Sequence, residues 1–305
     1  MSLLDLERTK VVYVGAPDDR GNRGDVFHLA GPAAGTEGVV WDDPEGHYFS
    51  PTKILSSSSA RQDGATPLRS VRDPRELTFT AQVGGDSPRE FFAHNDRWWR
   101  NWSTERDGFL CFYTKAFGWW NVPARLSAEA EPTTAQDPQF DFFESYKVHA
   151  TAFDPAYQAI EETFVWTNSL GLSEGSLLIP NRGTQKLWPR YTMNGPGRYY
   201  IEDPLSTDDD IRIVQTPKLL AGETLRIDTF ERRQTAMVYS TATGPNGRNV
   251  WAQLGGRRWL FGILPSVVNP ETGSPEPTEI RVIVEDGNLS SHVIATTTQR
   301  MPRPY

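Results

Sequence analysis

The segment Glu76-Leu-Thr-Phe-Thr-Ala-Gln-Val83 decides the fold of the first half of the chain. From Leu77 and Phe79 onward its apolar residues alternate with polar ones, and this period of two places them on one face of a half-buried strand. Ser87-Pro-Arg-Glu90 follows at once and has the form of a helix-capping box, with Pro88 at the first helical position. The stretch therefore predicts a strand followed directly by a helix.

The predicted helix spans Ser87–Asp107 and ends before Gly108. Large aromatic side chains recur along it at helical spacing. They could form a platform for sugar rings or bases. Packing of the helix against a sheet is the favoured interpretation, because the flanking strands are apolar and aromatic side chains bury large areas. The residues expected in this core are Leu77, Phe79, Phe91, Trp98 and Trp102.

Short strands separated by turns extend outward on both sides of this segment. The serine-rich stretch Ile54–Gly64 is polar and is predicted to be a loop. The other strands expected in this half are Lys10–Val14, Asp25–Leu29, Gly38–Trp41, Phe109–Tyr113, Trp119–Val122 and the long Phe140–Phe153.

The second half also alternates strands and turns, after a mixed stretch at 155–176 that is predicted to be a linker or crossover. We therefore expect a domain junction between residues 155 and 180. Turn residues then recur every 8–12 residues or so without a long helix, which is typical of a β-sandwich. The proline-rich end, Gln299–Tyr305, is expected to be extended. The strands expected here include Leu177–Pro180, Arg198–Ile201, Ile211–Val214, Leu225–Asp228, Ala236–Tyr239, Trp259–Leu264 and Glu279–Val284.

Length and composition narrow the class of protein. A chain of 305 residues suggests about two domains, and 37% hydrophobic residues with 23% charged residues exclude a disordered chain. A single cysteine, Cys111, excludes an internal disulfide and a cysteine-cluster metal site. No apolar run approaches the roughly 18 residues of a membrane span, and the acidic start lacks the features of a secretory signal. We expect a soluble protein made in the cytoplasm, with no membrane span.

The net charge of −8 is unevenly distributed. Residues 1–154 contain 16 Lys and Arg against 23 Asp and Glu, and so carry −7 of the total. Binding to nucleic acid depends on basic side chains that neutralise phosphates. An acidic chain without a basic stripe therefore argues against sequence-specific nucleic-acid binding.

A search for catalytic motifs leaves few candidates. The sequence has no phosphate-binding glycine loop, no HExxH zinc motif and no GxSxG nucleophile elbow. The histidines are scattered; His149 lies in a predicted strand, and Cys111 in an apolar strand where an inert buried thiol is expected. Asp208–Asp210 is the best cation candidate, but it lacks the spacing of a calcium loop and is better explained as a solvated turn. We therefore expect no enzyme activity, no catalytic or metal-binding residues and no cofactor.

The order of the elements is more informative than any single site. The first half ends in Tyr146-Lys-Val-His-Ala-Thr-Ala-Phe-Asp-Pro-Ala-Tyr157, which resembles the close of the ring domain in distal tail proteins of long-tailed, non-contractile phages, often called minor tail proteins. The resemblance covers roughly residues 5–285. In the second half it rests on Asn181–Thr184, Pro189, Asn194–Gly195, Gly222–Thr229 and Trp251–Leu254, which are similar to the galectin-like sandwich of that family.

This resemblance implies a ring-forming β-sandwich or barrel domain with one helix at residues 1–157. It implies a galectin-like β-sandwich with an extended C-terminal tail at residues 158–305. Proteins of this kind form a homo-oligomeric ring, usually a hexamer, that joins the tail tube protein to other tail-tip proteins and lets DNA pass. The implied location is the tail tip of the virion.

Two other functions stay open at this point. A carbohydrate-binding adhesion module is the first, with Trp188, Trp251 or Trp259 stacking on a sugar if exposed. Galectin sugar sites use a set of histidine, asparagine and arginine beside a stacking tryptophan, whereas His292, the single histidine of residues 160–305, lies near the C-terminus and outside any such cluster. The second is a polysaccharide hydrolase, which requires two carboxylates about 5–9 Å apart in a cleft.

Overall fold

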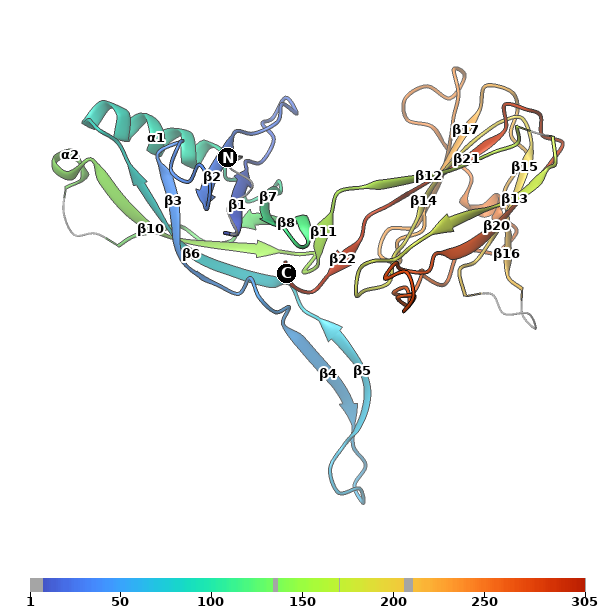
Figure 1. The fold of residues 1–305 in the computed structure, drawn as a ribbon, viewed down its shortest axis with the longest axis horizontal. Helices are drawn as coiled ribbons and strands as arrows, with labels where there is room; N and C mark the ends of the chain where they lie inside the picture. The colour runs from blue at the N-terminus through green and yellow to red at the C-terminus, as the bar shows by residue number, and fades with distance from the viewer. Residues whose placement is uncertain (1–7, 134–136, 170, 206–210, 305) are drawn as a thin grey trace. The chain divides into compact units, whose positions relative to one another are not determined.

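The computed structural model describes residues 8–133, 137–169, 171–205 and 211–304 (Figure 1). The chain divides into two compact units. Unit 1 consists of Met1–Ala159 and Met301–Tyr305, and unit 2 of Ile160–Arg300. Both are built mainly of antiparallel strands, so the prediction of a mainly β fold is confirmed.

Unit 1 is organised around a ten-stranded sheet. Its main path runs β2-β1-β7-β8-β10-β6-β3, and β9, β11 and β22 pair outside that path. The longest pairing joins β10 to β6 over ten residues of each strand, with His149 opposite Thr78. The strands are β1 (Lys10–Val14), β2 (Val26–Ala30), β3 (Val39–Glu45), β6 (Arg75–Gly84), β7 (Gly108–Thr114), β8 (Gly118–Leu126), β9 (Glu131–Pro132), β10 (Phe143–Ala152), β11 (Tyr157–Ala159) and β22 (Arg300–Met301).

The helix α1 (Pro88–Arg100) packs its apolar face against this sheet. Trp98 is fully buried and meets the Phe27 ring edge-on at 5.0 Å between ring centroids, while Tyr13 stacks on Trp102 at 4.2 Å. Aromatic pairs in such geometries stabilise beyond their buried area. The residues expected in the core all lie in this one buried cluster: Leu77, Phe79, Phe91, Trp98 and Trp102.

The start of α1 follows the capping prediction, but its end does not. The Ser87 hydroxyl accepts from the Glu90 amide at 3.3 Å, as a capping box requires. The helix stops at Arg100 rather than at Asp107, because Asn101 turns inward. The Asn101 side chain accepts from the Asp25 amide at 2.7 Å, and its backbone carbonyl accepts from the Tyr13 hydroxyl at 2.9 Å. Contacts with β1 and with Asp25, the residue before β2, therefore end the helix.

The predicted loop at Ile54–Gly64 is wrong over its first part. Residues Thr52–Ser57 form strand β4, which pairs with β5 (Thr66–Arg72) in a separate two-stranded sheet. The strands were not recognisable from a hydrophobic pattern because both faces of this hairpin are exposed, so neither carries an apolar alternation.

Two further expectations in this region are corrected. The predicted strand Phe140–Phe153 begins with a short helix, α2 (Pro138–Asp141), and the strand itself starts at Phe143. The predicted linker at 155–176 instead contains β11 and β12 (Glu162–Thr167) and reaches into β13 (Glu174–Ile179). These strands are stabilised by pairing with segments distant in sequence, β8, β21 and β20, which local composition does not reveal.

Unit 2 is a β-sandwich of two antiparallel sheets. The order of the six-stranded sheet is β12-β21-β14-β17-β18-β19 and that of the four-stranded sheet β13-β20-β15-β16. Inward residues from both sheets, such as Tyr191 and Val282, form a single buried cluster. The remaining elements are β14 (Arg190–Asn194), β15 (Arg198–Glu202), β16 (Ile213–Gln215), β17 (Thr224–Asp228), β18 (Thr235–Tyr239), β19 (Arg248–Asn249), the 3₁₀ helix η2 (Trp251–Leu254), β20 (Thr278–Glu285) and β21 (His292–Thr297).

The strand predicted at Trp259–Leu264 is absent from the described part of unit 2. Only an isolated bridge, between Leu187 and Ile263, lies there. The amides of Leu260 and Phe261 instead donate to the Asp203 carboxylate, at 3.0 and 3.3 Å. A buried carboxylate therefore takes backbone donors that a strand ladder would have used.

Candidate assembly surface

The most unusual surface of unit 1 is the β4–β5 hairpin, called here the arm (Thr52–Arg72). Figure 1 shows it extending away from the ten-stranded sheet as a separate ribbon. Every residue of its two strands is exposed except Leu55 and Val71, which are half-buried. Ile54 and Leu68 are each 65% exposed. Apolar side chains on both strands are thus left in water.

Strand register determines which arm residues share a face. Leu55 lies opposite Arg69 and Lys53 opposite Val71, so these four side chains lie on one face. Ile54 lies opposite Ser70 on the other face, and the register shifts at Leu68, which lies unpaired in a bulge. Each face combines apolar and polar groups, as surfaces that bind other proteins commonly do.

The arm also differs from the rest of its domain in charge. It contains four basic residues and one acid, Asp63, for a net charge of +3. The remainder of residues 1–154 therefore carries −10. None of the ion pairs among the described residues involves an arm residue. The four basic residues are Lys53, Arg61, Arg69 and Arg72.

The arm is anchored at its base by Arg75, which is fully buried just after β5. Its guanidinium donates to the carbonyl of Gly46 at 2.9 Å, to the Ser50 hydroxyl at 2.7 Å and to the Pro155 carbonyl at 2.9 Å. It also donates to the carbonyl of Pro302, in the C-terminal segment of unit 1. Arg75 thus binds both sides of the arm base to the end of the sheet and to the chain terminus.

Electrostatics at the arm base follow from this burial. Desolvation lowers the pKa of Arg75, and the Tyr157 ring below its guanidinium, at 4.9 Å, provides a cation–π contact. The Tyr157 hydroxyl donates to the His47 carbonyl at 2.9 Å. Desolvation, followed by the charge of Arg75, lowers the pKa of His47, whose ring stacks on Phe112. The arm base is therefore held by a buried, hydrogen-bonded arginine and tyrosine, Arg75 and Tyr157.

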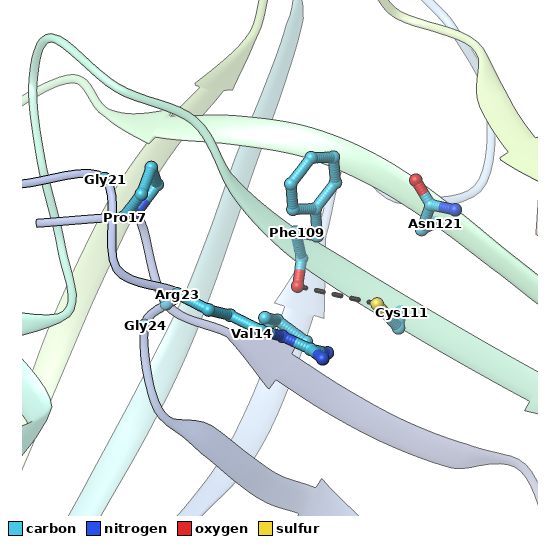
Figure 2. Close-up of a pocket in the computed structure, with 9 residues that line it drawn as sticks. Val14, Pro17, Gly21, Arg23, Gly24, Phe109, Cys111 and Asn121 are labelled. Atoms are coloured by element: carbon cyan, nitrogen blue, oxygen red, sulfur yellow. Dashed lines mark hydrogen bonds between the residues drawn. The ribbon is translucent and has the colours of Figure 1, made fainter.

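A pocket of about 500 Å³ lies on the outer side of β1, β7 and β8, and Figure 2 shows Cys111 on its wall. The Cys111 thiol makes a contact of 3.7 Å with the Phe109 carbonyl. Burial raises the pKa of Cys111 to about 12, so the thiol stays protonated at neutral pH. The wall residues shown with it are Val14, Pro17, Arg23 and Asn121, which include no general base for a thiol.

The three tryptophans considered for stacking on sugars differ in their exposure to solvent. Trp259 is 2% exposed and packs against Tyr191 at 5.4 Å between ring centroids, so it lacks the exposure on which stacking against a sugar depends. Trp188 and Trp251 are half-buried, and Trp251 packs against the core of unit 2. Neither presents a fully exposed ring.

A smaller pocket of about 270 Å³ lies on the six-stranded sheet of unit 2. Arg190, Arg226 and Asp228 line it together with Tyr239. The Tyr239 ring is already covered on one face by the Arg226 guanidinium at 5.0 Å. Stacking of a sugar on that face would require the arginine to move.

The other residues singled out in the sequence form no site among the described residues. His149 Nδ1 lies 3.2 Å from the Thr78 hydroxyl, a cross-strand contact within the β10–β6 pairing. Asp208–Asp210 lies outside the described residues. Across the described ranges, no group of three or more histidine, cysteine or acidic side chains is arranged to hold a metal ion. Within the same ranges, no helix has both the length and the apolar character needed to cross a membrane.

Comparison with known proteins gives the fold a context. The chain is similar in structure to the Dit protein (gp 19.1) of phage SPP1, with a TM-score of 0.59 and 12% identity over 96% of this chain and 99% of that one. That protein is described as a paradigm of the hub adsorption apparatus in phages that infect Gram-positive bacteria. The fold is therefore shared along nearly the whole length of both chains.

A chain of the phage P2 baseplate is also similar. In the activated conformation with Ca it gives a TM-score of 0.53 and 9% identity, over 95% of this chain and 98% of that one. The baseplate with Sr gives the same values. No protein-family model and no curated protein matches the sequence. At these identities the shared property is the fold.

Sequence reasoning did not find the arm or its anchor. Arg75 was one of many arginines, and its burial depends on carbonyls up to 227 residues away in sequence. A faint indication was present in the charge pattern, since four basic residues fall within Thr52–Arg72 of an otherwise acidic half.

Proposed function

We propose that this protein is a structural component of a phage tail tip, where unit 1 of several copies forms a ring. The observation that supports this most strongly is the similarity in fold to SPP1 Dit along 99% of that chain. The baseplate chain of phage P2 supports the same proposal. Both neighbours are tail components, so the location we propose is the virion tail tip.

The ring is proposed to contain six copies, as the family resemblance suggests. A closed ring requires a heterologous interface, in which each copy presents one surface to the next copy and a different surface to the previous one. The partners in the virion would be the tail tube protein on one side and other tail-tip proteins on the other. The ring-forming domain corresponds to unit 1, and the galectin-like sandwich of the proposal to unit 2.

The charge of unit 1 suits a passage for DNA. Residues 1–154 carry −7, so six copies carry six times that charge, or −42. Acidic groups lining the passage would repel phosphates and let the duplex slide without binding. Exposed arginines lining the passage in an assembled tail tip would contradict this part of the proposal and leave the ring intact.

A structural role is preferred to the two alternatives. For glycan binding, the burial of Trp259 leaves Trp188 and Trp251 as the tryptophans that could stack on a sugar, and both are half-buried. A hydrolase would need a paired set of carboxylates in a cleft. The pocket beside Cys111 has no acidic residue among those that line it. A pocket of about 400 Å³ beside β3 and β6 is lined by Asp86 and Glu90, but the Glu90 carboxylate there accepts from the Asp86 amide at 3.0 Å, at the start of α1.

Electron microscopy of the purified full-length protein tests the proposal. We expect rings with a central passage, and six-fold class averages. Sedimentation at the same concentration should give the mass of the same assembly. A protein that stays monomeric or dimeric, both alone and at the tail tip of a virion, would contradict the ring. Hydrolysis of an envelope polysaccharide, abolished by one Asp or Glu substitution, would contradict the structural role.

A further inference from the structure

We infer that the arm of one copy docks on the acidic edge strand β3 of the neighbouring copy. This inference rests on the proposed ring and names the contact that holds it. Its occupant is a second copy of this chain.

The first step is that the arm lacks cover in a single chain. Two-stranded hairpins are marginally stable in water unless they pack against something else. Here both outer edges lack a strand partner among the described residues, and Ile54 and Leu68 stay 65% exposed. Unpaired edges with exposed apolar side chains favour pairing with another protein surface.

The second step is that the charge selects the kind of partner. The arm carries +3, so it is attracted to acidic surfaces. The rest of residues 1–154 carries −10, so every further copy of the chain brings such a surface. Duplex DNA is also acidic, but phosphates offer no cover for Ile54 and Leu68. A protein surface satisfies both the charge and the apolar groups.

The third step is the receiving surface. Strand β3 is last in the order of the ten-stranded sheet, and its second edge pairs with no other strand among the described residues. Asp42, Asp43 and Glu45 are exposed on it and take part in none of the ion pairs of the described residues. Acidic groups on an open edge repel acidic strands, disfavour uncharged strands because pairing would desolvate the carboxylates, and attract a basic strand. The edge is therefore selective for a hairpin such as the arm.

The fourth step is preorganisation. Arg75 fixes Gly46 and Ser50 on one side of the arm through hydrogen bonds of 2.9 and 2.7 Å. Because these hydrogen bonds already restrain the base of the arm in the free chain, less conformational entropy is lost when the arm docks. With a rise of about 3.3 Å per residue, strands of this length reach about 20 Å from that base, enough to meet an adjacent subunit.

The test compares the assembly of full-length variants by sedimentation velocity and electron microscopy. The arm variant combines Lys53→Glu, Arg69→Glu and Arg72→Glu. The control combines Arg20→Glu, Arg89→Glu and Lys115→Glu, three exposed residues outside the arm that change net charge equally. We expect self-association at least about 100-fold weaker in the arm variant and wild-type rings in the control. Self-association of the wild type should also weaken as the salt concentration rises from about 0.05 to 1 M, because the Debye length shortens to about 3 Å.

A charge swap identifies the contact. A variant with Asp42→Lys and Glu45→Lys should also lose self-association, and combining these changes with the arm variant should restore it. Circular dichroism and thermal unfolding establish that each variant is folded, since all the changed side chains are exposed. Rescue by the swap is the result that a merely destabilised variant does not give.

The outcomes separate this inference from the proposed function. If the wild type forms rings and the arm variant forms them equally well, arm docking is wrong and the ring proposal stands. If the wild type stays monomeric at every salt concentration and at the tail tip, the ring proposal fails and the inference fails with it. If the arm variant keeps its rings but loses retention of duplex DNA in a mobility-shift assay, the arm is a DNA contact and docking on β3 is overturned.

Discussion

Helix α1 and the arm belong to the same unit, but they differ in how far their side chains are buried within a single chain. The helix buries Phe91 and Trp98 completely, and its start is satisfied by the Ser87 cap. The arm buries none of its strand residues completely. The helix is thus completed within one chain, while the arm has local hydrogen bonds but no tertiary cover.

This difference in burial indicates which residues of unit 1 contribute to the free energy of folding and which contribute to association between copies. Burial of apolar area is the main favourable contribution to folding, so residues under α1 should dominate the free energy of unfolding. Arm residues should contribute little to that quantity and much to association. The following predictions test this division, beginning with the largest expected effect on stability.

Truncation of Trp98 should have the largest effect. Trp98→Ala removes a fully buried ring that contacts Phe27 and Tyr13, and should cost about 3–5 kcal/mol of unfolding free energy, enough to prevent stable folding of unit 1. Urea unfolding followed by circular dichroism measures it. Phe92→Ala is the matched control, because Phe92 is 45% exposed on the same helix. A folded Trp98→Ala protein that loses only partner binding would show that the helix is itself an interface.

Loss of the arm anchor should come next. Arg75→Met leaves the carbonyls of Gly46, Pro155 and Pro302 without their donor, at a cost of about 2–4 kcal/mol after the gain from removing a desolvated charge. Hydrogen exchange should also accelerate around Ser50. Arg72→Met, at an exposed arm position, provides the control. Unchanged stability and exchange in Arg75→Met would mean that the base does not depend on this side chain.

A smaller effect should appear on mild acidification. Burial holds the pKa of His47 below its ordinary value, so the unfolded chain gains a proton before the folded one does. The stability contributed by neutral His47 is therefore present above the ordinary histidine pKa and is lost as pH falls below it. His47→Phe, which preserves stacking on Phe112, should flatten the dependence of unfolding free energy on pH between about 7 and 5. A wild-type slope retained in this variant would assign the effect to other groups.

Substitutions in the arm should have the smallest effect on stability. Ile54→Ser combined with Leu68→Ser should change the free energy of unfolding by no more than about 0.5 kcal/mol, because both side chains are exposed in the single chain. Thermal unfolding at a concentration too low for assembly measures this. A clear loss of stability in the monomer would place the arm within the fold of its own chain and remove the contrast with α1.

Prediction from the sequence succeeded where local interactions decide the structure. The first strand was predicted at Lys10–Val14 and has those bounds, because its alternation and flanking turns are local features. The start of α1 was predicted from Ser87 and Pro88 for the same reason. The end of α1 was not, because Asn101 is held by Asp25, 76 residues away in sequence.

Errors in the candidate site have the same origin. Trp259 was a possible sugar platform in sequence, but packing against Tyr191 in the core of unit 2 removes it from solvent. Cys111 is not such an error, because burial raises the pKa of its thiol to about 12, in line with the inert thiol expected there. Whether a side chain is exposed depends on which sheet covers it, and composition does not contain that information.

The sequence by itself determined the mainly β class, the position of α1 and the acidic character of residues 1–154, because each depends on residue types and their local spacing. Only the tertiary structure decided that Thr52–Arg72 is an uncovered arm and that Arg75 holds its base. The physical reason is that burial and long-range hydrogen bonding are properties of pairs of segments far apart in the chain. The local sequence therefore does not show which arginine is buried or which hairpin is left exposed.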